Sequence, residues 1–118
     1  MIYLAQTDTT VGFLSTSTEE LSYAKARDEK QPFIICVSSF KKLKKLTRVA
    51  KKDKKLVRRS KKTTFIYPNN KAIRVVNDEK HNELLKRFDY LYSTSANEHK
   101  KSFDLNYALK MADIVVKT

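Results

Sequence analysis

Short runs of hydrophobic residues alternate along the chain with stretches in which hydrophobic residues recur every three or four positions. A run of about 4–8 apolar residues is typical of a buried strand, and the longer spacing is typical of a helix with one buried face. The pattern therefore indicates an α/β or α+β domain. It predicts strands at residues 2–5, 32–37, 63–67, 72–76, 90–92 and 114–116, and helices at residues 18–24, 40–46, 50–59, 79–88 and 105–111.

Polar residues mark the starts of most of these helices. Ser17 and Glu20 have the spacing of a capping box, in which the two side chains bind backbone N–H groups that the first helical turn leaves free. Single Ser, Asn or Asp residues precede three of the other helices. We expect N-caps at Ser17, at Ser38 or Ser39, at Asn77 or Asp78, and at Asp104. The segments 7–10 and 93–97, rich in Ser and Thr, read as loops that follow strands.

The length and composition indicate one domain, residues 1–118, with a buried core. The longest uncharged apolar run, residues 33–37, is far shorter than the roughly 20 residues that cross a bilayer. The first residues lack the pattern of a secretory signal, so we expect a cytoplasmic protein with no membrane partner. The single cysteine, Cys36, lies in a predicted buried strand, where we expect it to pack rather than to react.

The positive charge is concentrated in one segment. Residues 41–62, here called the basic segment, contain 13 Lys or Arg residues and one acid, whereas the rest of the chain holds 12 bases and 12 acids. A cluster of like charge favours a polyanion such as RNA, because phosphate contacts release counterions. The alternative is a solvated helical face. The segment has one aromatic residue beside it, Phe40, so we expect RNA contacts to phosphates without base specificity.

Several kinds of site are excluded by what the chain lacks. With one glycine, Gly12, it has neither a Walker-type phosphate loop nor a dinucleotide fingerprint, which need several glycines. His81 and His99 are isolated from Cys36 in the sequence, so we expect no metal site, no Cys-His nucleophile, and two surface histidines. Ligands of α/β sheets bind beyond the carboxyl ends of strands, where hydroxyls orient them and cations neutralise phosphate. Hydroxyl-rich residues 7–10 and 93–97 are candidates, although such segments are often only turns and caps.

Five short motifs, in matching order, resemble those of the YrdC/YciO family. Residues 6–13, Gln-Thr-Asp-Thr-Thr-Val-Gly-Phe, are similar to the family's Pro-Thr-Asp/Glu-Thr-x-Tyr-Gly-Leu, and Lys-Ala-Arg at 25–27 is similar to the start of its Lys-x-Arg-Pro-x-x-Lys-Pro. Residues 64–68 resemble the family strand that begins with Thr, and residues 72–75 resemble its Ala-Val-Arg strand. Residues 93–97 match its Ser-Thr-Ser-Ala-Asn motif in full. The resemblance extends over about residues 2–116.

The resemblance implies a fold and an activity. The fold is α/β, with a twisted mixed sheet flanked by helices. Family enzymes join L-threonine, bicarbonate and ATP into threonylcarbamoyl-AMP and pyrophosphate for tRNA modification. Magnesium arrives with ATP, so no tightly bound cofactor is expected. A threonylcarbamoyl-transferase that uses the product is an expected partner.

The resemblance also implies residue roles, none of them nucleophilic. Thr7, Thr9, Arg74 and Ser93 would bind threonine or its carbamate. The residues implied for ATP binding are Lys25, Arg27, Thr64, Ser95 and Asn97.

A second function remains open from the sequence. Gln6, Val11 and residues 59–63 differ from the family motifs, and together with the basic segment they favour a catalytically weakened module that binds tRNA or double-stranded RNA. The intact Lys25 and the 93–97 motif favour the enzyme, a nucleotidyltransferase, over the module. In either case the expected RNA-binding residues are Lys51, Lys52, Lys54, Lys55, Arg58 and Arg59.

Overall fold

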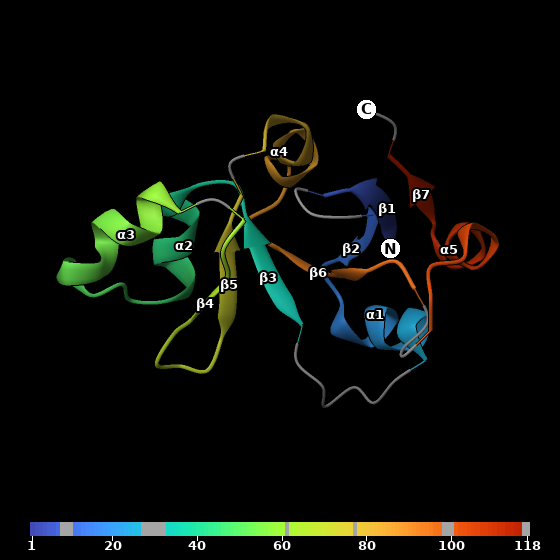
Figure 1. Cartoon of the computed structure of the whole chain (residues 1–118), viewed down its shortest axis with the longest axis horizontal. Coiled ribbons are helices and arrows are strands. Elements are labelled where there is room, and N and C mark those ends of the chain that lie inside the picture. The colour runs from blue at the N-terminus through green and yellow to red at the C-terminus, as the bar shows by residue number, and fades with distance from the viewer. Residues whose placement is uncertain (8–10, 27–32, 61, 77, 98–100, 117–118) are drawn as a thin grey trace.

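A computed structural model describes residues 1–7, 11–26, 33–60, 62–76, 78–97 and 101–116 of the chain. These residues form a seven-stranded mixed sheet with helices packed on both faces (Figure 1). The strands are β1 (Tyr3–Gln6), β2 (Val11–Ser15), β3 (Ile34–Val37), β4 (Phe65–Ile66), β5 (Ala72–Val75), β6 (Leu91–Ser95) and β7 (Ile114–Val115). The helices are α1 (Thr18–Lys25), α2 (Phe40–Leu46), α3 (Lys54–Arg59), α4 (Glu79–Leu85) and α5 (Leu105–Met111), and a short 3-10 turn, η1 (Lys51–Asp53), precedes α3.

The strand order in the sheet is β4-β5-β3-β6-β2-β1-β7. Strands β3 and β5 pair in parallel, as do β1 and β7, and the other neighbouring pairs are antiparallel. The α/β class with a twisted mixed sheet, expected from the family resemblance, is confirmed.

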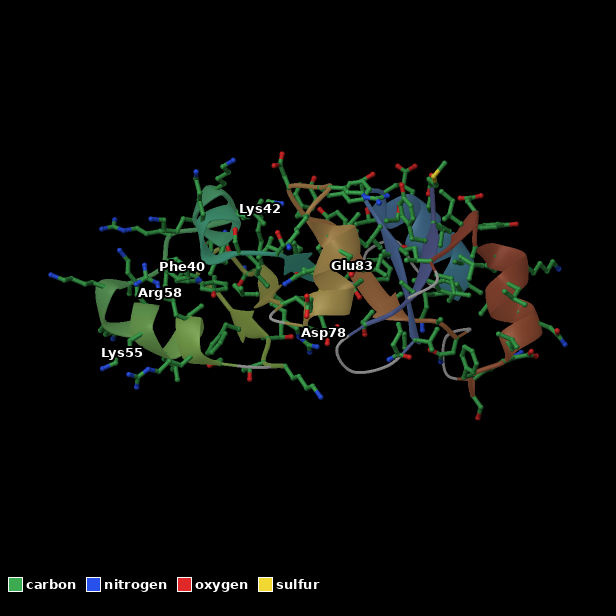
Figure 2. The ribbon with its side chains drawn as sticks, turned by 90° about the horizontal axis from the view of Figure 1, so that it is seen from above. Phe40, Lys42, Lys55, Arg58, Asp78 and Glu83 are labelled. Carbon is green, nitrogen blue, oxygen red and sulfur yellow. The ribbon has the colours of Figure 1, made fainter. Side chains whose placement is uncertain are left out.

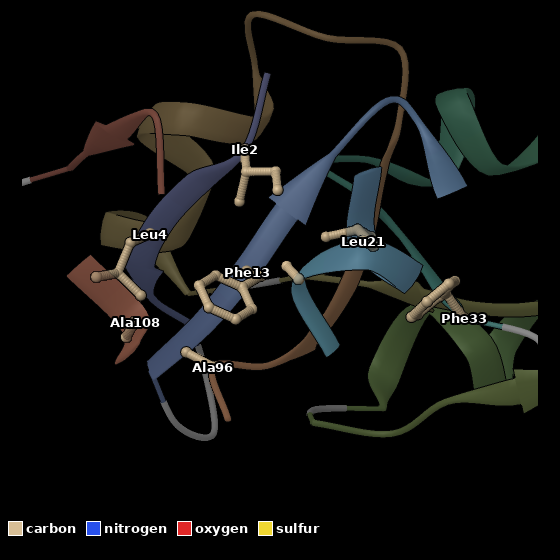
Figure 3. Close-up of a cluster of buried hydrophobic side chains, with 8 residues drawn as sticks. Ile2, Leu4, Phe13, Leu21, Phe33, Ala96 and Ala108 are labelled. Atoms are coloured by element: carbon tan, nitrogen blue, oxygen red, sulfur yellow. The ribbon is translucent and has the colours of Figure 1, made fainter. Parts of the chain in front are cut away.

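Two hydrophobic clusters cover the opposite faces of the central strands. Phe13 and Leu14 are consecutive in β2 and fully buried, and because strand side chains alternate they enter different clusters. The cluster around Phe13 includes residues of α1 and α5 (Figure 3). The cluster around Leu14 includes Leu84 and Leu85 of α4, together with Cys36. The packing role expected for Cys36 is therefore confirmed.

A third cluster joins the basic segment to the sheet. Leu43 of α2 and Val57 of α3 pack against Ile35, Val37 and Ile73 of β3 and β5. The apolar face of each basic helix is thus buried, while the lysines and arginines occupy the other faces. This arrangement places the basic segment at one end of the long axis of the molecule, away from α5 and β7 (Figure 1).

The helix starts follow the sequence. Ser17, Ser39 and Asp78 each accept a hydrogen bond from the backbone N–H three residues later, and Asp104 accepts from the backbone N–H groups two and three residues later. A cap is confirmed at each predicted place, with Ser39 and Asp78 used where two residues had been left open. The capping box is wrong, because the Ser17 N–H donates to Ser15 Oγ while the Glu20 carboxylate accepts from the N-terminal amino group and from Ser15. Within the described residues, no helix is long and apolar enough to cross a membrane.

Three further expectations from the sequence are wrong. Strand β2 was not predicted at all, and residues 93–95, expected in a loop, belong to β6. His81, expected at the surface, is 2% exposed, because it lies three and four positions before Leu84 and Leu85 and so shares their buried face of α4. His99 lies outside the described residues.

Candidate functional site

The strand register places three of the predicted ligand-binding residues on one face of the sheet. Ser95 of β6 pairs with Gly12 of β2, and Ser93 pairs with Ile34 of β3. Arg74 of β5 pairs with a residue of β3 two positions beyond Ile34. Paired residues point to the same side of a sheet, and so do residues two apart in a strand. Ser93, Ser95 and Arg74 therefore share a face, which we call the polar sheet face.

Helix α4 covers the other end of this same face. Leu14, Cys36 and Leu91 lie on it and pack with the leucines of α4, so that Leu91 is fully buried. Farther along β6, Ser93 is half-buried and Ser95 is exposed. The transition from apolar to hydroxyl side chains along one strand leaves polar groups where the helix cover ends.

Gly12 of β2 leaves room for the Thr7 side chain and for the backbone of β6. A Cβ atom at Gly12 would lie 2.9 Å from the Thr94 carbonyl oxygen, 3.0 Å from Thr7 Cγ2 and 3.9 Å from Ser93 Oγ. The first distance is shorter than Cβ atoms show in proteins and the second is tight, so any other residue here would require the Thr94 backbone to shift. The same distances show that Thr7 and Ser93 lie together, which the sequence alone predicted only through a shared ligand.

Lys25 brings a buried positive charge to the end of β6. Its side chain is 4% exposed, and its Nζ donates hydrogen bonds to Ser95 O at 3.2 Å, Ser95 Oγ at 3.2 Å and Asn97 Oδ1 at 2.9 Å. The lysine at the end of α1 and the 93–97 motif, which the family resemblance assigns to one ligand, therefore lie together at the end of β6. An ammonium has three donors, so these contacts hold both it and the chain around Asn97 in one geometry.

The backbone of α1 turns sharply after Lys25. Ala26 has φ 54° and ψ 48°, a left-handed conformation that disfavours residues with a side chain. The Tyr107 hydroxyl of α5 donates to the Ala24 carbonyl and supports this turn. Arg27, expected to bind ATP, and Thr9, expected to bind threonine, lie outside the described residues.

Arg74 of β5 and Thr64, the residue before β4, form a second contact at the other side of β3. Arg74 Nε donates to Thr64 Oγ1 at 2.9 Å, and both side chains are half-buried. The guanidinium is thereby oriented on the polar sheet face. Hydroxyls, a guanidinium and an ammonium are groups that bind carboxylates and phosphates, and they need no protein nucleophile to do so.

The basic segment presents a different kind of surface. Side chains of α2 and α3 extend into solvent at this end of the molecule (Figure 2), and all the expected RNA-binding residues except the half-buried Lys54 are exposed. The Phe40 ring is covered, because Arg58 Cζ lies 4.5 Å and Lys44 Nζ 5.9 Å from its centroid. Lys42 Nζ donates to Phe88 O at 2.6 Å and so binds the chain just after α4.

The polar sheet face thus presents hydroxyl groups and the Arg74 guanidinium, with the Lys25 ammonium at the end of β6. The family model Sua5/YciO/YrdC, which carries the description "telomere recombination", matches residues 2–114. The chain therefore belongs to this family. No protein with a curated description matches the sequence.

Two solved structures resemble the chain over nearly its whole length. A variant of Sua5 from P. abyssi has a TM-score of 0.75 and 18% identity, covering 97% of this chain and 44% of the Sua5 chain. The solution structure of protein MTH1692 from Methanobacterium thermoautotrophicum has a TM-score of 0.66 and 24% identity, covering 98% of this chain and 67% of the MTH1692 chain. The chain thus has the Sua5/YrdC fold and spans less than half the length of P. abyssi Sua5.

One residue of the site was absent from the roles inferred from sequence. Gly12 has no side chain, and Thr7 and Ser93 pack close to it for that reason. A lone glycine between apolar residues signals a close backbone approach, so this role was accessible from the sequence.

Proposed function

We propose that the chain is a threonylcarbamoyl-AMP synthase-like protein that forms L-threonylcarbamoyladenylate from L-threonine, bicarbonate and ATP, for the modification of tRNA. Threonine and bicarbonate give a carbamate with loss of water. A carbamate oxygen then forms a bond to the α-phosphorus of ATP while the bond from that phosphorus to the bridging oxygen breaks. Pyrophosphate leaves with the electron pair, and Mg²⁺ bound to ATP accompanies the phosphates as part of the substrate.

The observation that carries this proposal is the gathering of hydroxyls and cations around Ser93 and Ser95. The reaction brings together an anionic carbamate and an anionic phosphate, so its barrier falls if fixed cations and donors hold both. Thr7, Ser93 and Arg74 are the proposed contacts for threonine and its carbamate. Thr64, Ser95 and Asn97 are the proposed contacts for ATP.

The proposed role of Lys25 in ATP binding follows from its hydrogen bonds. Its ammonium is already held by three oxygens of Ser95 and Asn97, so direct contact with a phosphate requires the exchange of at least one of them. We propose that Lys25 orients Ser95 and Asn97 and supplies positive charge to the phosphates. Arg27 and Thr9 are proposed for the phosphates and for threonine on the family motifs alone.

The test is threonine-dependent release of pyrophosphate. Purified protein is incubated with ATP, Mg²⁺, bicarbonate and L-threonine, and pyrophosphate and the adenylate are measured by a coupled assay and by mass spectrometry. We expect both products, and neither when threonine or bicarbonate is left out. Binding of ATP without formation of the adenylate would contradict the synthase proposal.

We propose RNA, either tRNA or double-stranded RNA, as the macromolecular partner of the basic segment. The supporting observation is that the segment packs apolar residues on the sheet and leaves most of its described cations exposed. A threonylcarbamoyl-transferase is the proposed second partner, since the threonylcarbamoyl group of the reactive adenylate must pass to the amino group of an adenosine of the tRNA, with AMP as the leaving group.

A further inference from the structure

The basic segment borders an apolar cavity that it does not form alone. The cavity has a volume of about 580 Å³ and lies between the chain before η1, helix α3 and the turn from β4 to β5. Its walls include Val49 and Val57 from the basic segment, and Phe65, Tyr67 and Pro68 from beyond it. The volume is within the roughly 300–1,000 Å³ of small-molecule sites.

A cationic hollow adjoins this cavity. It has a volume of about 480 Å³, is lined by Lys44, Lys45, Lys51 and Lys54, and shares Thr47, Arg48 and Val49 with the apolar cavity. A ligand that occupied both spaces would need an apolar part and an anionic part directly linked to each other. A nucleotide has this construction, with a flat base on one side of its sugar and a phosphate on the other.

Exposed apolar side chains flank the cavity. Leu56 of α3 is 58% exposed and Ile66 of β4 is 78% exposed, and both line it. Covering such side chains with a flat apolar surface lowers the free energy, because apolar area is removed from water. Their place beside a strongly positive surface favours an occupant that is apolar on one face and negative elsewhere.

We propose that the apolar cavity takes one unpaired base of a bound RNA while the neighbouring lysines hold its phosphates. The inference rests on the proposed RNA binding by the basic segment and is independent of the proposed synthase activity. This proposal replaces the expectation, drawn from the sequence, that RNA is bound only through its phosphates. That expectation counted only aromatic residues near the basic segment in sequence, whereas Phe65 and Tyr67 lie outside the segment and line the cavity beside it in the fold.

The chemistry of the lining favours a base with an amino group. Asp53, the one acid of the basic segment, lines the cavity, and a carboxylate accepts hydrogen bonds from the exocyclic amino groups of adenine, cytosine or guanine. Uracil has no such group. Burial, followed by the negative charge of Asp53, raises the pKa of Tyr67, so this part of the wall stays uncharged at neutral pH. The covered Phe40 ring offers no competing platform for stacking.

The experiment compares RNA hairpins that differ at one position. Four labelled hairpins, whose stems are closed by a non-nucleotide linker in place of a loop, carry no unpaired nucleotide, one unpaired adenosine, one unpaired uridine, or one unpaired abasic site. Their affinities are measured by fluorescence anisotropy at one salt concentration. We expect the adenosine hairpin to bind about 5- to 150-fold more tightly than the fully paired hairpin, the range of one base stacked on a protein surface. The abasic hairpin should bind like the paired one, and the uridine hairpin between the two.

Matched variants locate the effect. The double variant Leu56→Ala/Ile66→Ala should lose most of the preference for adenosine and keep the affinity for the paired hairpin. Leu105→Ala/Leu109→Ala is the control, because these leucines of α5 are exposed to 57% and 46% and lie far from the basic segment (Figure 1). Asp53→Asn should reduce the preference for adenosine over uridine and spare the preference for adenosine over the abasic site.

Three results would overturn the inference. Equal affinity for all four hairpins would show that no base is bound, and equal gains for the adenosine and abasic hairpins would show that only backbone flexibility matters. Free AMP that binds in a Leu56-dependent way, with no preference among the hairpins, would assign the cavity to a mononucleotide instead of RNA. Failure to bind the paired hairpin at all would instead refute the proposed RNA binding.

Discussion

Lys25, which contacts Ser95 of the polar sheet face, and the lysines of the basic segment differ in how much solvent surrounds their charges. Lys25 is 4% exposed and held by three hydrogen bonds. Lys51, Lys52 and Lys55 are exposed side chains on short helical turns. A fixed, desolvated cation suits one ligand geometry, whereas mobile solvated cations attract any polyanion and are screened by salt.

The difference originates in packing. Lys25 is enclosed because α1 packs on the sheet beside the end of β6. Its ammonium therefore binds oxygens of the chain at the end of that strand. The helices of the basic segment bury only one apolar face each, which leaves the remaining faces to lysine and arginine. The two regions should therefore respond separately to substitution.

The largest expected effect separates the regions by salt dependence. Lys51, Lys52, Lys54 and Lys55 are changed together to Gln, and RNA binding is measured by anisotropy across salt concentrations. If each lysine neutralises one phosphate, the slope of log K against log salt should flatten by roughly 3–4 units. ATP and threonine binding should stay nearly unchanged.

The control for this variant removes the same number of charges elsewhere. Changing Lys71, Lys86, Lys101 and Lys110 to Gln also lowers the net charge by four, and all four are exposed outside the basic segment. If both sets flatten the slope equally, net charge and not the basic segment controls RNA binding. Loss of ATP binding with an intact slope in the first set would place the basic segment in the catalytic site.

The next largest effect concerns Lys25. Lys25→Ala should weaken ATP binding by about 1.5–3 kcal/mol, or roughly 10- to 150-fold, the scale of hydrogen bonds made by a charged group. Isothermal titration calorimetry checks this, with Lys110→Ala on the exposed side of α5 as control. RNA affinity for a paired hairpin should be the same in both variants. Unchanged ATP affinity in Lys25→Ala would remove this residue from the nucleotide site.

Gly12→Ala sharpens the comparison by disturbing only the polar sheet face. The added Cβ would lie 2.9 Å from a backbone oxygen, so we expect a loss of about 1–3 kcal/mol in the free energy of unfolding, the usual range for overpacking. Urea unfolding measures it. The additional change Thr7→Ser removes Cγ2, the second close atom, and should restore only part of the loss because the Thr94 carbonyl remains. Full recovery would show that the backbone contact is harmless.

The smallest effect lies beside the basic segment, at Tyr67. Burial is the larger cause, and the charge of Asp53 the smaller, of a pKa raised above the usual value of about 10. The unfolded chain then loses the tyrosine proton first as pH rises, so stability is full below about pH 10 and falls as pH increases through the folded-state pKa. Tyr67→Phe should flatten this fall.

Urea unfolding at pH 8 and at pH 10.5 tests the pH dependence. At pH 8 we expect the Tyr67→Phe variant to be nearly as stable as the wild type, because the buried hydroxyl has no hydrogen-bond partner among the described residues. Tyr23→Phe is the control, since Tyr23 is 75% exposed. Equal pH dependence in both variants would exclude Tyr67 as the group responsible.

The N-cap positions were predicted correctly from the sequence, because a few neighbouring residues determine each cap. The caps at Ser17, Ser39, Asp78 and Asp104 were all predicted, because a side-chain oxygen and the first helical N–H groups are only two or three residues apart. The family and the mixed α/β sheet also followed from short motifs in order. The errors concern residues whose state depends on distant neighbours.

Residues 93–95 illustrate this dependence. Three hydroxyl residues have the composition of a loop, yet β2 pairs with all three of them and β3 pairs with Ser93 on the other side. Strand β2 was not predicted because its five residues include a glycine and end in serine, and both residues are uncommon in strands.

The amino-acid sequence of this protein encodes the helix caps, the core positions of most elements, and the separation of charge into one segment. The fold alone decides that Lys25 meets Ser95 and Asn97, 70 and 72 residues away, and that Phe65 and Tyr67 line a cavity with the basic helices. Capping and hydrophobic periodicity act over one or two turns of chain, whereas a binding site requires strand order and register, which depend on how all the strands pair at once.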